Sequence, residues 1–216
     1  MVNPQRKTDF ESLEITHARD DAAAVPRSRR SWRGAGVSDH FVQFYRDESV
    51  LIDAVAGFIA EGLQTVEGGI VIATKEHRET LEGRLEKQGI DLAALRARSQ
   101  YVPLDAEETL ARFMVNGLPD GELFSHVVGS VVTRMVSAGY RVRAFGEMVA
   151  LLLAGGNPKA AIQLENLWNS LGKTRRFALF CAYPMAHFEN GTNAAEFRHI
   201  CSAHESHIPA EGAAAC

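Results

Sequence analysis

Arg143 and Glu147 lie where one apolar run ends and another begins, in the stretch RVRAFGEMVALLL. If the first run is a strand, Arg143, Phe145 and Glu147 point to the same side of it. A buried carboxylate without a partner costs several kcal/mol, so Glu147 needs a counter-charge, water or a ligand. We expect the two residues to pair with each other, or with His40 or Glu165. The pair is then either a structural ion pair at this corner or a ligand-recognition pair.

Cysteines and C-terminal histidines offer thiol and imidazole groups, which are good zinc ligands. Cys201, His204 and His207 recur every third residue in HICSAHESH, so they drift only slowly around a helix. No fourth ligand is evident, and a solvated C-terminal helix explains the same pattern. We therefore predict no metal site and no cofactor. Cys181, in FALFCAYP, is expected to be a buried and inert thiol, with a sensing thiol as the alternative.

The motifs of nucleotide-binding enzymes and serine hydrolases are missing from the positions where they would act. A phosphate-binding loop, G-x-x-x-x-G-K-[ST], would follow the first predicted strand, where the chain reads YRDESVL. The glycine-rich GGNPK stands between two predicted helices instead. G-x-G-x-x-G and G-x-S-x-G are also absent. We therefore expect the protein not to be an enzyme, with residual nucleotide hydrolysis as a rival that ATP-binding calorimetry would test.

Apolar and β-branched runs alternate with segments of helical periodicity from Asp39 onward. Asp47 and Asn157 are suited to cap helices, and Pro158 suits a first helical position. Pro103 predicts an edge strand or an early end to strand pairing, because proline cannot donate a hydrogen bond to a neighbouring strand. Predicted strands span 40–45, 70–74, 100–105, 142–146 and 176–184, and predicted helices about 50–63, 75–88, 106–116, 121–138, 147–154, 158–171 and 194–204. The alternation indicates an α/β domain with a mainly parallel central sheet.

Ligands of open parallel sheets bind at the carboxyl ends of the strands. The residues at those ends are polar or aromatic in most cases: Tyr45, Arg46, Asp47, Thr74, Asp105, Gly146, Glu147, Cys181, Tyr183 and Pro184. We expect a small-molecule crevice there, with polar recognition by Arg143 and Glu147. Tyr45, Phe145 and Tyr183 would supply its apolar walls.

The composition fits one soluble domain of 216 residues, of which 46% are hydrophobic, with a formal net charge of −4. No stretch reaches the roughly 18–20 apolar residues of a membrane-spanning helix. The N-terminus lacks the apolar core of a signal peptide. Three cysteines are too few, and odd in number, for a disulfide scaffold. We therefore expect a cytoplasmic protein with no membrane partner.

The first 38 residues carry 7 Lys/Arg and 5 Asp/Glu, and four of the arginines lie in PRSRRSWR. Such a cluster can bind nucleic acid or a membrane surface. Because the apolar content around it is low, we predict a disordered leader and do not expect nucleic acid as a partner. DNA binding through this segment would depend on salt and would be lost when residues 1–38 are deleted.

The ordered set of motifs HFVQFY, the glycine turn with IVIAT, FGEM, LENLWNSL and FALFCAYP resembles the MEDS domain. This is the sensory domain of methanogen and methylotroph regulators, including the repressor of dichloromethane degradation. The resemblance covers about His40–Phe188 and implies a RecA-like or clock-ATPase-like core that has lost its phosphate loop. It also implies a signalling role, with sensing of small hydrocarbon derivatives. The positions that match the family's distinctive residues are His40, Tyr45, Gly146, Glu147, Met148, Glu165, Cys181 and Tyr183.

Together these features predict a leader (1–38), a sensory domain (39–190) and a C-terminal polar helix with a tail (191–216). The fold class is a three-layer, RecA-like α/β domain with a mainly parallel sheet of about five or more strands. The predicted ligand-binding residues are His40, Tyr45, Arg143, Glu147, Glu165, Cys181 and Tyr183. With no output module in view, the partner would be a signalling protein such as a histidine kinase or a transcription regulator, and a homodimer stays open. The alternative is a ligand-free interaction module that regulates a histidine kinase or an anti-sigma system.

Overall fold

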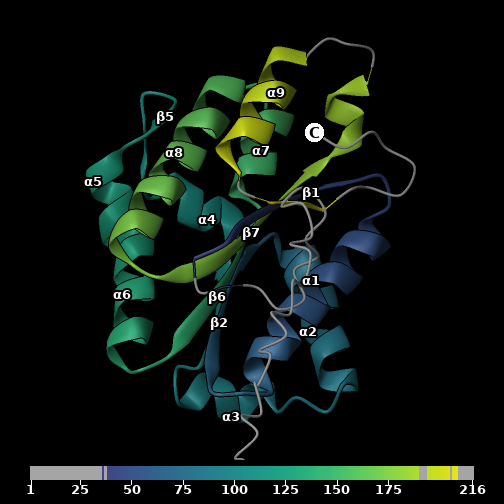
Figure 1. Ribbon diagram of the computed structural model, residues 1–216, viewed down its shortest axis with the longest axis vertical. Coiled ribbons are helices and arrows are strands. Elements are labelled where there is room, and N and C mark those ends of the chain that lie inside the picture. The colour runs from purple at the N-terminus through teal and green to yellow at the C-terminus, as the bar shows by residue number, and fades with distance from the viewer. Residues whose placement is uncertain (1–35, 37, 190–193, 205, 209–216) are drawn as a thin grey trace, which may run out of the picture.

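The computed structural model describes residues 36, 38–189, 194–204 and 206–208. Its centre is a sheet of six parallel strands in the order β3-β2-β6-β7-β1-β8 (Figure 1). The strands are β1, His40–Tyr45; β2, Glu67–Ala73; β3, Tyr101–Asp105; β6, Arg141–Gly146; β7, Phe177–Pro184; and β8, Ser206–Ile208. The predicted leader, apart from residues 36 and 38, and the tail from residue 209 lie outside the described residues.

Helices cover both faces of this sheet, which confirms the predicted three-layer α/β fold (Figure 1). The α1–α3 layer consists of α1, Glu48–Leu63; α2, Lys75–Lys87; and α3, Leu92–Ala97. The α4–α9 layer consists of α4, Ala106–Ala111; α5, Gly121–Phe124; α6, Ser130–Ser137; α7, Met148–Ala154; α8, Pro158–Thr174; and α9, Ala194–Ala203. Because both faces are covered, β2 and β7 are buried at every position but one and consist almost wholly of apolar residues.

The alternation of side chains along β1 and β7 decides which residues can meet. Those that face the α4–α9 layer include Val42, Phe44, Phe177, Leu179, Cys181 and Tyr183. Those that face the α1–α3 layer include Tyr45, Ala178, Phe180 and Ala182. His40 pairs with Leu179 in the parallel register of the two strands. Its side chain therefore falls on the same face of the sheet as Cys181, two residues further along β7.

The region between β3 and β6 differs most from the sequence-based expectation. The helix predicted for about 106–116 ends at Ala111 and is followed by a hairpin of β4, Met114–Val115, and β5, Leu118–Pro119. Asn116 and Gly117 join these strands with positive φ angles of 50° and 78°. Asn-Gly is the strongest short hairpin signal, because both residues tolerate that backbone conformation. A π-helical turn at Ser125–Gly129 interrupts the predicted helix at 121–138, and α3 and β8 were not predicted.

Several local predictions are confirmed. The Asp47 carboxylate accepts a hydrogen bond from the Ser49 backbone N–H at 2.8 Å and caps α1. The Asn157 side chain caps α8 in the same way, with Pro158 as the first residue of the helix. β3, which contains Pro103, lies at the edge of the sheet. Among the described helices, none is long and apolar enough to cross a bilayer.

Candidate functional site

The predicted ligand-binding residues do not meet at one crevice. The sheet separates four of them, on the side of the α4–α9 layer, from two on the side of the α1–α3 layer, while the seventh lies at the carboxyl end of β6. His40, Glu165, Cys181 and Tyr183 lie on the α4–α9 side, Tyr45 and Arg143 lie on the α1–α3 side, and Glu147 lies at the carboxyl end of β6. The three places have different chemistry.

Arg143 forms a complete ion-pair network with the α1–α3 layer. Its Nε donates to Glu67 Oε2 at 2.6 Å, and its Nη1 donates to Glu61 Oε2 at 3.1 Å and to the Phe58 carbonyl oxygen at 3.1 Å. The guanidinium also lies over the Phe58 ring, 5.2 Å from its centroid. We call these four residues the Arg143 cluster. The cation is 8% exposed and has three hydrogen-bond acceptors, which is the geometry of a structural ion pair.

Glu147 connects β6 to the beginning of α2. Its Oε2 accepts a hydrogen bond from the Thr74 backbone N–H at 2.8 Å, and its Oε1 lies 2.6 Å from His77 Nδ1. The hydrogen bond to Glu147 raises the pKa of His77 above its usual value. The predicted pairing of Glu147 with Arg143 is therefore wrong, because each residue has its own partners elsewhere.

The predicted aromatic walls are also divided. Tyr45 and Phe145 pack in the core on the α1–α3 side, whereas Tyr183 packs in the core on the α4–α9 side. Burial raises the pKa of Tyr45 above its usual value, so its hydroxyl stays protonated at neutral pH. The three rings cannot line a single crevice, because the sheet lies between them.

Glu165 is the centre of the third place, and His204 joins the four predicted residues there. The Tyr183 hydroxyl donates to Glu165 Oε1 at 2.6 Å. Glu165 Oε2 lies 3.5 Å from His40 Nε2, 3.5 Å from His204 Nε2 and 3.7 Å from Cys181 Sγ. His40 Nε2 lies 3.4 Å from Cys181 Sγ. We call these five residues the Glu165 cluster; all of them are buried.

Four separate elements carry the cluster. His40 is the first residue of β1, and Cys181 and Tyr183 are on the same face of β7. Glu165 lies in the buried stripe of α8, where apolar side chains would be expected, and His204 directly follows α9. The Asn157 side chain caps the start of α8. The chain therefore brings residues as far apart as His40 and His204, which are 164 positions apart, together around one carboxylate.

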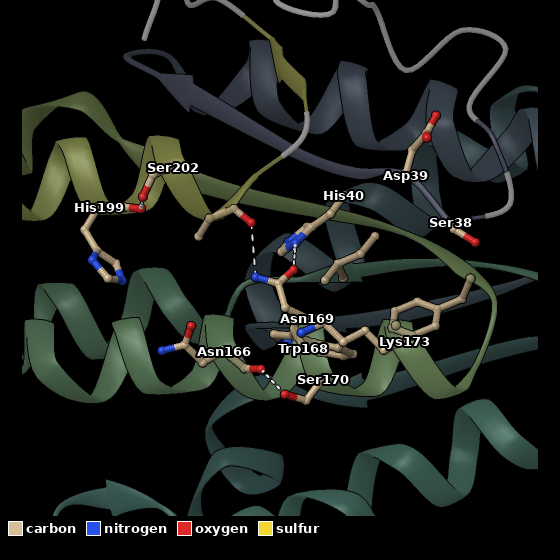
Figure 2. Close-up of a pocket in the computed structure, with 14 residues that line it drawn as sticks. Ser38, Asp39, His40, Asn166, Trp168, Asn169, Ser170, Lys173, His199 and Ser202 are labelled. Carbon is tan, nitrogen blue, oxygen red and sulfur yellow. Dashed lines mark hydrogen bonds between the residues drawn. The ribbon is translucent and has the colours of Figure 1, made fainter.

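Hydrogen bonds at the outer side of both imidazoles fix their orientation. His40 Nδ1 lies 2.9 Å from Asn169 Oδ1, and the Asn169 amide nitrogen donates to the Ala203 carbonyl oxygen at 3.1 Å (Figure 2). His204 Nδ1 lies 2.7 Å from the Ile200 carbonyl oxygen. Both acceptors require an Nδ1–H donor, so the lone pair of each Nε2 points into the cluster.

Burial keeps the cluster in unusual protonation states. It lowers the pKa of His40 to about 3, with a further contribution from the neighbouring His204, and the pKa of His204 to about 4. It also raises the pKa of Glu165, and it raises those of Cys181 and Tyr183 well above their usual values. At neutral pH both imidazoles are therefore neutral, and their contacts with Glu165 are not ion pairs. His204 Nε2 is a buried atom without a hydrogen-bond partner among the described residues.

A groove of about 600 Å³ lies beside the cluster, between α8, the end of α9 and the amino ends of β1 and β7 (Figure 2). Its lining includes Asp39, His40, Trp168, Asn169, Lys173, Phe177, His199 and Ser202. His40 belongs to both the groove and the cluster. This groove is at the opposite end of the strands from the carboxyl-end crevice, which stays a prediction.

The three-residue spacing at the C-terminus does not bring its side chains together. His207 Nε2 lies 2.8 Å from the carbonyl oxygen of Cys201, while His204 points to Glu165 instead. The sequence pattern therefore grouped His204 with Cys201 and His207 rather than with Glu165, and it did not indicate Asn169. Asn169 lies four residues after Glu165 on α8, and i, i+4 spacing on one helix face could have identified it.

One comparison with known proteins identifies a family. The sequence model of the family described as "MEthanogen/methylotroph, DcmR Sensory domain" matches residues 39–205, which is more than half of the chain. The matched range includes α9 and His204, which we had placed outside the sensory domain. A search of curated proteins found no significant match.

Proposed function

Because the chain belongs to the MEDS family of sensory domains, we propose that it is a non-catalytic signalling module that binds a small ligand in the groove. Binding changes the position of α9 and β8, which present the signal to a partner protein. The observation that carries this proposal is the pair of hydrogen bonds made by Asn169. One side chain in the groove connects His40 of β1 with Ala203 of α9.

The size and lining of the groove fit a small organic ligand. Its volume is within the range of small-molecule sites, which is about 300–1,000 Å³. Trp168, Phe177 and Leu179 provide apolar surface, and Lys173 and Ser170 provide polar groups. This combination suits a short hydrocarbon chain that carries a polar or anionic end.

The contacts around α9 offer a route for the signal. Asn169 uses both ends of its amide, so a ligand that takes either hydrogen bond breaks the connection that runs from β1 through α8 to the end of α9. β8 follows α9 directly and pairs with β1 as the outermost strand. A ligand that binds the two arrangements of α9 with different affinity shifts the population between them.

The loop after β1 supports a role without nucleotide hydrolysis. A phosphate would bind at the N-terminus of α1, but the Asp47 carboxylate already accepts the hydrogen bond of the Ser49 N–H there. Hydrogen bonds with the side chain and then the backbone of Ser49 lower the pKa of Asp47, so the position carries a negative charge. Glu48 adds a second acidic residue in the first turn. Two carboxylates disfavour a phosphate at this helix end.

The proposal is tested with a panel of short alcohols, carboxylic acids and halogenated alkanes. Binding is detected by thermal shift, and the response of residues 194–208 by amide hydrogen exchange. We expect a ligand that changes exchange in this segment of the unmodified protein. Asn169→Ala should bind with at least about tenfold lower affinity or lose the exchange response.

Asn166→Ala is the matched control, because Asn166 lines the same groove from the same helix but has no side-chain bond to β1 or α9 among those of the described residues. It should keep the exchange response. A full response in Asn169→Ala would contradict the proposed route. Binding of a histidine kinase without a response to any compound in the panel would favour the ligand-free interaction module.

A further inference from the structure

We propose that the Glu165 cluster is a site for one divalent transition-metal ion of the Zn²⁺ type. The four ligand atoms are His40 Nε2, Glu165 Oε2, Cys181 Sγ and His204 Nε2, which all lie within 4.8 Å of one another. This inference does not depend on the ligand in the groove, because it rests on atoms that face into the protein.

Four of the six distances between the ligand atoms match those of a tetrahedral site. Zn–N bonds of about 2.0–2.1 Å and Zn–S bonds of about 2.3 Å place neighbouring ligand atoms about 3.3–3.6 Å apart. Glu165 Oε2 lies 3.5 Å from each of His40 Nε2 and His204 Nε2 and 3.7 Å from Cys181 Sγ. His40 Nε2 lies 3.4 Å from Cys181 Sγ. The other two distances, from His204 Nε2 to His40 Nε2 and to Cys181 Sγ, lie within 4.8 Å, so an ion at the centre would draw His204 inwards.

The hydrogen atoms available in the cluster leave an acceptor unpaired. Both Nδ1–H groups donate outwards, to Asn169 and to the Ile200 carbonyl oxygen, so both Nε2 atoms are acceptors. The Tyr183 hydroxyl is used by Glu165 Oε1, and the one hydrogen of the Cys181 thiol can serve either Glu165 Oε2 or His40 Nε2. His204 Nε2 has no partner among the described residues although it is buried and points at Glu165. A buried acceptor in this position indicates a missing positive group, and one cation would contact all four lone pairs at once.

The charges and the ligand types select the kind of ion. A thiolate from Cys181 and a carboxylate from Glu165 carry two negative charges, which a divalent cation neutralises, so the loaded site can be buried at low cost. Binding releases the proton of the Cys181 thiol, and any proton on Glu165, to solvent. Imidazole and thiolate favour zinc-type ions over Mg²⁺ and Ca²⁺. Four protein ligands close the coordination sphere, as in structural rather than catalytic zinc sites.

Neighbouring residues hold the ligands as in known metal sites, where the far nitrogen of a ligating histidine donates to a carbonyl or carboxylate. Asn169 and the Ile200 carbonyl oxygen do this for the two histidines, and Tyr183 does the equivalent for the carboxylate. His40 also lines the groove, which gives an ion a path from solvent. Since His204 directly follows α9, the ion would attach the C-terminal segment to β1, β7 and α8.

The test uses the full chain after removal of metal with a chelator. Native mass spectrometry should show one Zn²⁺ per chain after Zn²⁺ is added back. Co²⁺ should give the intense visible bands of tetrahedral coordination together with a thiolate-to-cobalt charge-transfer band. Cys181→Ser should lose the charge-transfer band, and His204→Gln should weaken the affinity at least about tenfold.

His207→Gln is the matched control, because His207 is three residues from His204 but its ring contacts the Cys201 carbonyl oxygen. It should bind Co²⁺ like the unmodified protein. The proposal is overturned if the folded chain binds no Zn²⁺ or Co²⁺, or if His204→Gln and Cys181→Ser bind them unchanged. Circular dichroism of each metal-free variant shows whether it is folded, and Glu165→Gln, which keeps the side-chain shape, provides a second ligand variant if Cys181→Ser does not fold. The metal-binding measurements do not use Asn169→Ala, which tests the groove proposal. Failure of the metal-site proposal can therefore be distinguished from failure of the groove proposal.

Discussion

The Arg143 cluster and the Glu165 cluster lie on opposite faces of one sheet, and each surrounds a buried ionisable side chain. Around Arg143, two carboxylates and a carbonyl oxygen receive the N–H groups that face them. Around Glu165, two imidazole lone pairs face the carboxylate, and His204 Nε2 has no donor among the described residues. In the first cluster the protein supplies the acceptors for the cation, whereas the second leaves a buried acceptor for a further positive group. Buried Arg143 therefore has a structural role on one face of the sheet, whereas buried Glu165 has a ligand-binding role on the other.

Arg143→Met tests the structural half of this comparison and should have the largest effect. It removes a buried cation and leaves Glu67, which is 13% exposed at its side chain, with only the longer contact of 3.5 Å to Arg141 Nε. We expect the free energy of unfolding to fall by about 3 kcal/mol. Chemical denaturation measures this loss, and Co²⁺ binding should not change. Arg46→Met, which breaks an exposed pair with Glu189, is the control and should cost less than about 1 kcal/mol. Equal losses in the two variants would contradict a structural role for Arg143.

Glu147→Gln tests a third buried carboxylate, which belongs to neither cluster. Glu147 connects the end of β6 to the start of α2 through its contacts with Thr74 and His77. Its hydrogen bond raises the pKa of His77, so the stabilisation is fully present below the ordinary histidine pKa of 6.5 and is lost as the pH rises through the raised value. We expect the variant to lose about 2 kcal/mol at low pH and less at alkaline pH. Urea denaturation at several pH values measures the difference. The same loss in Glu147→Gln at all pH values, or a loss that grows with pH, would show that His77 is not the partner that matters.

Gly62→Ala should give the smallest effect and tests how tightly the Arg143 cluster is packed. A Cβ at this position would lie 2.8 Å from Arg143 Cδ, whose side chain is held by its ion pairs. The clash should exceed the helix preference of alanine, for a net loss of about 1 kcal/mol. Gly83→Ala on α2 has nothing within 4 Å of the new Cβ and should instead gain up to about 1 kcal/mol. Thermal denaturation compares the two, and a gain in both would mean that Arg143 moves aside freely.

Much of the fold follows from local chemistry. The five longer strands, the caps at Asp47 and Asn157 and the edge position of Pro103 were predictable, because each depends on neighbouring residues or on burial of a whole strand. The Asn116–Gly117 hairpin was predictable too, and was missed because the apolar pattern around it suggested a longer helix.

The site was less predictable, because its geometry depends on which layer covers each face of the sheet. Strand alternation places Arg143 and Phe145 on one side, but it does not show that Glu61 and Glu67 lie there and that Glu165 lies on the other. The family resemblance supplied His40, Glu165, Cys181 and Tyr183 without their contacts. His204 could be placed only by the packing of α9 against α8, which no local pattern encodes.

The most direct test of the account compares the free energy of unfolding with and without one equivalent of Zn²⁺. The unmodified chain and Arg143→Met should both gain stability from the ion, because binding to the native state alone shifts the equilibrium. Glu165→Gln should gain none, and without metal it should be at least as stable as the unmodified chain, because its amide N–H groups can donate to the two Nε2 atoms. A gain in Glu165→Gln equal to that of the unmodified chain, or none in the unmodified chain, would contradict the claim that this cluster is built around a cation.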